Sequence, residues 1–186
     1  MPANDLFEAF KSRIATAEPA DLGPGPRAGV LPPLELNKVV DDFLDESKLP
    51  AANGDLIRSL VLLWHDHLDA AHVIVQDIEN ADGSFVHGIL HRREPDYGNS
   101  KYWFRRVGKH RCFPEIAGKV AGLPVLENEG DLARKLIRNG DWDSFAFIDA
   151  CEQAATRAAT DPQRRLLREI QRIEFVVLLE CFCRGA

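Results

Sequence analysis

Apolar residues recur at intervals of three and four positions along most of this 186-residue chain, which is the spacing of one face of an α-helix. Residues 36–44 show the pattern clearly, and residues 166–177 repeat it near the C-terminus. We find no pair of alternating apolar runs joined by a hairpin dipeptide, so we expect no β-hairpin. The pattern predicts an all-α fold.

Prolines and capping residues divide the chain into about nine expected helices. We expect them at residues 1–18, 36–44, 53–80, 84–94, 99–108, 114–120, 131–139, 143–159 and from 161 onward. Residues 19–34 are rich in Pro and Gly and lack periodicity, which is typical of a connector. The sequence thus predicts a single all-α domain, 1–186: an N-terminal helix (1–18), the connector (19–34) and a helical core (35–186). We expect a helical bundle of about seven to nine helices.

The composition excludes several classes of protein. Apolar residues make up 45% of the chain, but no apolar run approaches the ~20 residues that cross a bilayer, so we expect no membrane contact. The N-terminal residues include acids and lack the basic-then-apolar order of a signal peptide, so we expect a cytoplasmic protein. The net charge of −6 argues against general nucleic-acid binding. The four cysteines form no C-x-x-C pair, although Cys112 beside Arg111 has the cationic neighbour of a reactive thiol.

Titratable and cationic residues are concentrated in one part of the chain. All six histidines lie between residues 65 and 110. Between residues 87 and 111 there are seven Lys or Arg residues and only two acids, although the whole chain is acidic. A local cationic patch of this kind suits a small anionic ligand or an acidic partner segment. The clustering therefore predicts a functional site in this segment.

The expected helix 53–80 is apolar nearly all round, yet it carries one polar stripe. The stripe stacks at helical spacing and consists of His65, Asp69, His72 and Gln76. Burying such groups unpaired costs roughly 1–3 kcal/mol each, so something must satisfy them. One interpretation is a buried network in which Asp69 orients His65 or His72 while Arg92 or Arg93 pairs with a glutamate, Glu79 or Glu94. The other is a pocket for a ligand.

A metal site is a sharper form of the pocket. His87 and His91 share one helical face, and the short connection at residues 80–83 makes their helix an antiparallel neighbour of the preceding one, so His72 can face His87. Three imidazoles with Asp69 form a donor set suited to Zn, Fe or Mn. The spacing lacks the glutamate of H-E-x-x-H, because that position is Gly88.

These features predict a small-molecule enzyme, hydrolase-like and possibly assisted by a divalent metal. The residues and their expected roles are catalysis by His72, Asp69 and His65, anion binding by Arg92, Arg93, Arg105 and Gln76, and metal ligation by His72, His87 and His91. The alternative hypothesis is a non-enzymatic binding module, in which the cationic aromatic segment 91–111 meets an acidic partner. The two hypotheses predict different exposure. An enzyme needs the residues of the polar stripe to reach a concave pocket. A binding module needs Tyr97, Tyr102 and Trp103 at the surface and the histidines sealed inside.

The string HGILHRREPDYGNSKYWFRRVGKH, from His87 to His110, is preceded by Trp64-His65-Asp66, Asp69, His72 and Gln76. Together they resemble the core of a family of soluble bacterial and fungal proteins that has no assigned activity. The resemblance covers roughly residues 60–113, about a third of the chain. It implies a shared fold and a shared site, but it implies no substrate.

Overall fold

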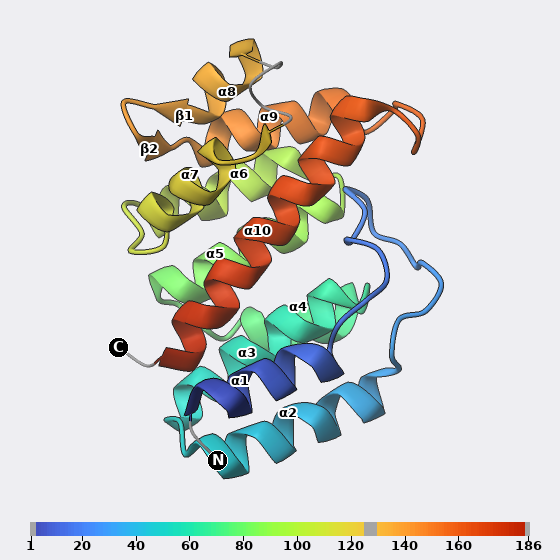
Figure 1. Cartoon of the computed structure of the whole chain (residues 1–186), viewed down its shortest axis with the longest axis vertical. Coiled ribbons are helices and arrows are strands. Elements are labelled where there is room, and N and C mark those ends of the chain that lie inside the picture. Colours follow the sequence, from blue (N-terminus) through green and yellow to red (C-terminus); the bar gives the residue numbers. More distant parts are fainter. Residues whose placement is uncertain (1–2, 125–129, 185–186) are drawn as a thin grey trace.

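The computed structural model describes residues 3–124 and 130–184, and these residues form ten helices and one two-stranded sheet (Figure 1). The elements are α1 (Ala3–Arg13), α2 (Pro33–Ser47), α3 (Ala51–Trp64), α4 (Leu68–Val75), α5 (Ala81–Arg93), α6 (Tyr97–Val107), α7 (Phe113–Ala121), α8 (Gly130–Leu136), β1 (Ile137–Arg138), β2 (Asp141–Trp142), α9 (Ser144–Ala154) and α10 (Pro162–Arg184). The all-α prediction is confirmed. The described part has more helices than the expected seven to nine, partly because the expected helix 53–80 is two helices.

The long helix α10 crosses the molecule diagonally and joins its two ends (Figure 1). Helices α1 to α4 lie at one end, and α7, α8, α9 and the small sheet lie at the other. Helix α10 packs against α3, α7 and α9, and its fully buried residues Leu167, Ile170 and Leu178 belong to the hydrophobic core. It begins as the sequence predicts: the carboxylate of Asp161 accepts hydrogen bonds from the backbone N–H groups of residues 163 and 164, with Pro162 in the first turn.

The break between α3 and α4 corrects the expected continuous helix 53–80. Helix α3 ends at Trp64 and α4 begins at Leu68. Between them Asp66 has a φ of 66°, a left-handed conformation that ends a right-handed helix. The apolar spacing continues on both sides of the break, so periodicity alone does not reveal it. As a result, the predicted polar stripe does not lie on one helix face.

Two other helix ends also differ from expectation. Asn80 caps α5, where its side chain accepts a hydrogen bond from the Gly83 N–H at 2.8 Å, so the expected cap Ser84 lies inside the helix. Asp96 caps α6 in place of Asn99, three residues earlier. In both cases a second capping residue precedes the expected one, and the earlier cap starts the helix.

The small sheet is a hairpin that the sequence analysis missed. Strands β1 and β2 pair antiparallel, with Ile137 opposite Trp142. Asn139 and Gly140 form the turn with φ values of 56° and 85°, the positive angles of a two-residue hairpin turn. Each strand has only two residues, too few for an alternating pattern, so the Asn-Gly dipeptide is the only local signal of this hairpin. The expected helix 131–139 ends at Leu136.

The segment between α1 and α2, residues 14–32, has no regular structure, as the predicted connector requires. It runs along one side of the molecule (Figure 1), and we call it the strap. Among the described helices, none is both long enough and apolar enough to cross a membrane.

Candidate metal centre

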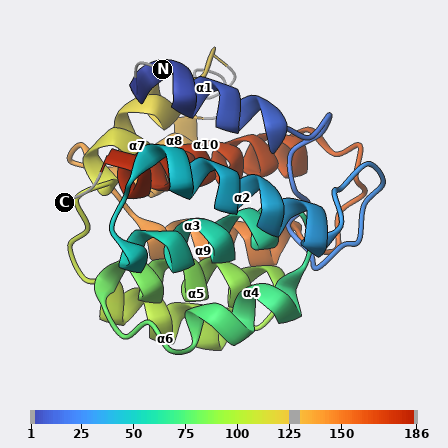
Figure 2. The same ribbon diagram turned by 90° about the horizontal axis from the view of Figure 1, so that it is seen from below.

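Three histidines from two neighbouring helices converge on one point. His87 and His91 are one turn apart on α5, and His72 projects from α4, which lies beside α5 (Figure 2). The Nε2 atoms of His72 and His87 are 2.9 Å apart. One potential ligand nitrogen from each ring lies within 4.8 Å of the other two. The structure thus brings together the three histidines that the sequence predicted as metal ligands.

Neighbouring groups hold the histidine rings in place. The Nδ1–H of His91 donates to the Glu94 carboxylate at 2.8 Å, and its Nε2 accepts from the Asn99 side-chain amide at 3.1 Å. The ring of His87 stacks between His91 and Trp103, with centroid distances of 4.8 and 3.9 Å. Metal-binding histidines characteristically donate their second N–H to a carboxylate, which fixes the tautomer. Glu94 stands in that position for His91.

The environment favours neutral imidazoles. Burial, together with the neighbouring His91 and His72, lowers the pKa of His87 to about 3. Burial also lowers the pKa of His91, although the carboxylate of Glu94 opposes that shift. A metal ion needs the nitrogen lone pair of the neutral ring. Near neutral pH, therefore, His87 and His91 are in the form that binds a metal.

The donor set fits a zinc-class ion after the histidine rings move. Tetrahedral zinc–nitrogen bonds of about 2.0–2.1 Å place two ligand nitrogens about 3.4 Å apart. The nitrogens here lie within 4.8 Å of one another, so the widest pair must approach by up to about 1.4 Å. His87 also has a buried Nδ1 with no hydrogen-bond partner among the described residues. An unpartnered buried nitrogen is uncommon in folded proteins. A bound ion that draws the three rings together can turn the His87 ring and so reorient this nitrogen.

Asp69 and His65, the other predicted catalytic residues, lie away from this centre. Asp69 is exposed, and the described residues offer its carboxylate no hydrogen bond or ion pair, so it orients neither His65 nor His72. His65 is fully buried in the break after α3, where its Nε2–H donates to the Ile14 carbonyl and its Nδ1 accepts from the Leu31 N–H. These contacts correct the predicted roles: His65 holds the strap, and Asp69 is a surface residue.

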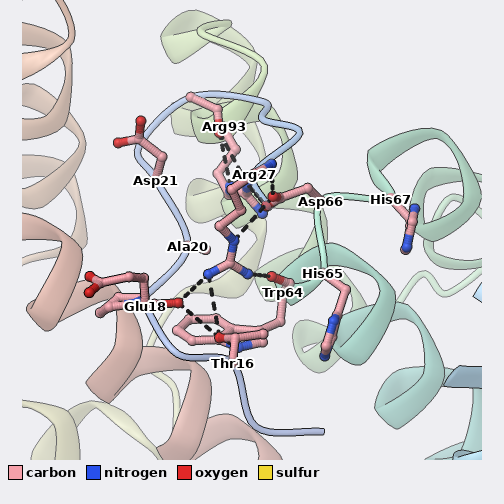
Figure 3. A network of polar contacts seen from close by, with 12 residues as sticks. Thr16, Glu18, Ala20, Asp21, Arg27, Trp64, His65, Asp66, His67 and Arg93 are labelled. Atoms are coloured by element: carbon pink, nitrogen blue, oxygen red, sulfur yellow. Dashed lines mark hydrogen bonds and ion pairs between the residues drawn. The ribbon is translucent and has the colours of Figure 1, made fainter. Parts of the chain in front are cut away.

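The predicted anion clamp is also corrected, because its guanidinium groups are sealed in the core. Arg92 is fully buried and pairs with Glu174 at 2.5 Å, and Gln171 accepts a further hydrogen bond from it. Arg93 is 1% exposed and pairs with Asp66 at 2.6 Å (Figure 3). These carboxylates, not Glu79 or Glu94, are the partners of the two arginines. An anion in solution has no access to either guanidinium.

The two remaining predicted anion-binding residues are at the surface. Gln76 is exposed, and its amide donates to the carbonyl of Val73 in its own helix. Arg105 is exposed, and its guanidinium lies 5.9 Å from the ring centroid of Phe145 on α9. Neither residue contacts the three histidines through a described hydrogen bond.

Three residues that support the histidines were not predicted as part of the site from the sequence: Glu94, Asn99 and Trp103. Glu94 lies three positions after His91, a spacing that places both side chains on one side of a helix, so this partner could have been found. Trp103 reaches His87 only because α5 and α6 pack closely, which no local pattern indicates.

A separate cavity of about 580 Å³ lies between α1 and α10. Trp64 and Phe175 line it, together with charged residues, and none of its described lining residues is a histidine. The histidine centre is instead reached through His72, which is half-buried while His87 and His91 are buried. An ion bound there would therefore lie near the surface.

Comparison of this chain with protein-family models, with curated proteins and with solved structures finds no match. A function must therefore be inferred from the histidine centre itself.

Proposed function

We propose that this protein binds a divalent metal ion of the zinc class through His72, His87 and His91 and uses it to hydrolyse a small anionic substrate. The observation that carries the proposal is the convergence of three imidazole nitrogens within 4.8 Å, supported by the carboxylate of Glu94 behind His91. Three nitrogen ligands match the donor number of catalytic zinc sites, which keep a further position for water.

When bound at such a centre, a zinc-class ion lowers the pKa of its water to about 7, which supplies a nucleophile for hydrolysis near neutral pH. The chain's own residues have separate parts in this scheme. The Glu94 carboxylate keeps the His91 proton on Nδ1, so the Nε2 lone pair faces the centre. The side-chain amide of Asn99 donates to that same Nε2. It must therefore turn away when the Nε2 lone pair binds an ion.

The anionic character of the substrate is inferred from a cationic side chain near the three histidines. Arg106 is exposed and lies over the ring of Trp103, 5.3 Å from its centroid, and the same indole stacks on His87. Among the described residues Arg106 has no ion-pair partner, so its guanidinium is available to a carboxylate or phosphate group. Arg106 therefore replaces Arg92 and Arg93 as the proposed anion-binding group.

Titration of the chelator-treated protein with ZnCl2 in a calorimeter tests the metal site. We expect one ion per chain for the wild type and a loss of affinity of at least about 100-fold for His72→Ala, because a ligand contributes no less than its supporting residues do. Glu94→Gln should weaken binding by about 10- to 100-fold. His67→Ala is the matched control, since His67 is also half-buried but donates to the Leu31 carbonyl in the strap.

Unchanged zinc affinity in His72→Ala would place the ion elsewhere and remove the basis of the proposal. Equal losses in His72→Ala and His67→Ala would mean that the effect is a general loss of folded protein, which circular dichroism of both variants would reveal. His72 is the variant of choice because it is the least buried of the three ligands.

Hydrolysis is tested separately with p-nitrophenyl phosphate and the neutral ester p-nitrophenyl acetate. We expect zinc-dependent release of p-nitrophenol from the wild type. In Arg106→Gln we expect kcat/KM to fall for the anionic phosphate and to stay unchanged for the neutral ester, so that the preference of the enzyme shifts away from the anion. Zinc binding without hydrolysis of either compound would refute the enzymatic part and leave a metal-binding protein. An Arg106→Gln variant with unchanged preference would refute the anionic substrate.

The alternative, a binding module for an acidic partner, is favoured by one observation. Tyr102 is 48% exposed, and the neighbouring Arg105 and Arg106 are exposed as well. An aromatic residue flanked by cations suits an acidic peptide. A poly-glutamate peptide that binds the wild type but not Tyr102→Ala would support this module, and zinc affinity unaffected by that substitution would separate it from the metal site.

A further inference from the structure

Two cysteines that are far apart in the sequence meet where α7 and α10 pack together. Cys112 precedes the first residue of α7, and Cys181 lies in the last turn of α10. The thiol of Cys112 faces Cys181 across this contact, close enough for the two side chains to interact. Cys112 is only 3% exposed, whereas Cys181 is partly open to solvent. One thiol of the pair is therefore reachable from solution and the other lies directly behind it.

A guanidinium group is held against the accessible thiol. The Nε–H of Arg111 donates to the Sγ of Cys181 at 2.9 Å, and its Nη2 donates to the Asp82 carboxylate at 3.1 Å. Asp82 also bonds to His110 at 2.8 Å, so its position is fixed from two sides. A guanidinium N–H that donates to a sulfur atom stabilises the negative charge that develops on this atom when it reacts.

The remaining thiols of the chain lack such a partner. Burial raises the pKa of Cys151 to about 12. Burial and the nearby Glu180 raise the pKa of Cys183 to about 12 as well. Burial and the contact with Cys181 raise the pKa of Cys112 above its usual range. The thiols of Cys151 and Cys183 therefore stay protonated near neutral pH. Among the four cysteines, Cys181 is the one whose sulfur accepts a hydrogen bond from a guanidinium group.

We propose that Cys181 and Cys112 form a modification site for hydroperoxides, in which Cys181 is oxidised first and Cys112 then closes a disulfide. The proposal is independent of the metal centre. It rests on the paired thiols, on the unequal exposure of the two residues, and on the hydrogen bond from Arg111.

The reaction is balanced with a hydroperoxide ROOH as the oxidant. The thiolate of Cys181 attacks the terminal peroxide oxygen, the O–O bond breaks, and the alcohol ROH leaves after taking up the proton that Cys181 released. The product is a sulfenic acid at Cys181. Cys112 attacks the sulfur of that group, the S–O bond breaks, and the thiol proton of Cys112 leaves with the hydroxide as water. Two thiols are oxidised and one peroxide is reduced.

The disulfide would join the start of α7 to the C-terminal part of α10. A cross-link between segments so distant in the sequence restricts the unfolded chain strongly, and the native contact already holds the sulfurs together. We therefore expect the oxidised protein to melt at a temperature several degrees higher than the reduced protein. The increase should disappear when dithiothreitol is added.

Treatment of the reduced protein with a slight excess of hydrogen peroxide, in the presence of a chelator, tests the site. We expect a loss of two hydrogen masses per chain and a single cross-linked peptide pair containing Cys112 and Cys181. Cys112→Ser should stop at the sulfenic acid of Cys181, which dimedone traps. Arg111→Gln should slow the oxidation of Cys181 by about tenfold or more, because it removes the donor to the sulfur.

Cys183→Ser is the matched control, since Cys183 lies two residues from Cys181 on the same helix and is also partly exposed. It should form the disulfide at the wild-type rate. A cross-link involving Cys183, or one between two copies of the chain, would overturn the assignment. So would an oxidation rate that is equal in the wild type and Arg111→Gln, or a Cys181→Ser variant that still loses two hydrogens.

Discussion

Individual histidines have different functions in this molecule, and their partners decide which. His65 and His67 bond to carbonyl groups of Ile14 and Leu31 and fasten the strap. His110 bonds to a carboxylate at the start of α5. Only His72, His87 and His91 face one another. The concentration of six histidines in one segment therefore combines structural residues with a candidate site, and residue type alone does not separate them.

His65 should make the stability of the protein depend on pH. Burial is the main reason why the pKa of this ring is lowered in the folded protein, and its Nδ1 accepts a backbone N–H from Leu31 that a protonated ring would repel. The unfolded chain therefore binds a proton at higher pH than the folded chain. The stabilisation is complete above the unfolded value of about 6.5 and is lost as the pH falls toward the folded value.

The measurement is the urea midpoint of wild type and His65→Gln at pH values from about 7.5 to 5, the range around the ordinary histidine pKa. A glutamine keeps one donor and one acceptor but does not titrate, so the variant should lose less stability on acidification than the wild type. Parallel pH profiles for the two proteins would show that His65 does not contribute to the acid sensitivity.

At the scale of elements, the close packing of α5 against α6 positions the histidine centre. A Cβ atom added to Gly88 would lie 2.7 Å from the ring of Phe104, and the Ser100 hydroxyl donates to the Gly88 carbonyl at 2.7 Å. The same approach brings Trp103 onto His87. Gly88 also replaces the glutamate of an H-E-x-x-H motif, and the packing of α6 gives a physical reason for a glycine there.

We expect Gly88→Ala to destabilise the fold by about 1–3 kcal/mol, the usual cost of overpacking a core. Gly118→Ala is the control: Gly118 lies inside α7, and a Cβ there would have no atom within 4 Å. That substitution should stabilise the protein by about 0.5–1 kcal/mol, because alanine favours a helix interior. Chemical denaturation measures both, and equal effects would contradict the close contact of α5 and α6.

At the scale of the whole molecule, the strap is joined to the helical core through a buried ion network. The carboxylate of Asp66 accepts from the guanidinium Nε–H of Arg27 in the strap at 3.1 Å and from Arg93 in α5 at 2.6 Å (Figure 3). The side chain of Arg27 also reaches the carbonyl of Trp64. One residue in the break between α3 and α4 thus holds an N-terminal segment against the centre of the fold.

Asp66→Ala should cost about 3–5 kcal/mol, because it leaves the buried guanidinium of Arg93 without its counter-charge. The strap should then detach, so trypsin should cut after Arg27 faster than in the wild type. The control is Asp41→Ala, which removes a largely exposed partner of Arg58 and should change the stability by no more than about 1 kcal/mol. A strap that resists trypsin in Asp66→Ala would show that other contacts hold it.

Much of the fold and part of the candidate site can be predicted from the sequence because they depend on neighbouring residues. The helices follow from apolar spacing, the start of α10 follows from Asp161-Pro162, and the irregular strap follows from its prolines and glycines. The three histidines follow from one helical spacing and one short connection. All these features are determined within a few turns of chain.

Only the tertiary structure decided which charges are buried together. Arg92 finds Glu174, 82 residues away, and Arg93 finds Asp66 in a helix break, so neither is left for an anion. Cys112 meets Cys181 because α7 packs on α10. Periodicity shows that a helix face is apolar, but any distant apolar face can cover it. Which face does so depends on the packing of the whole chain, and that choice assigns the partners of every buried polar group.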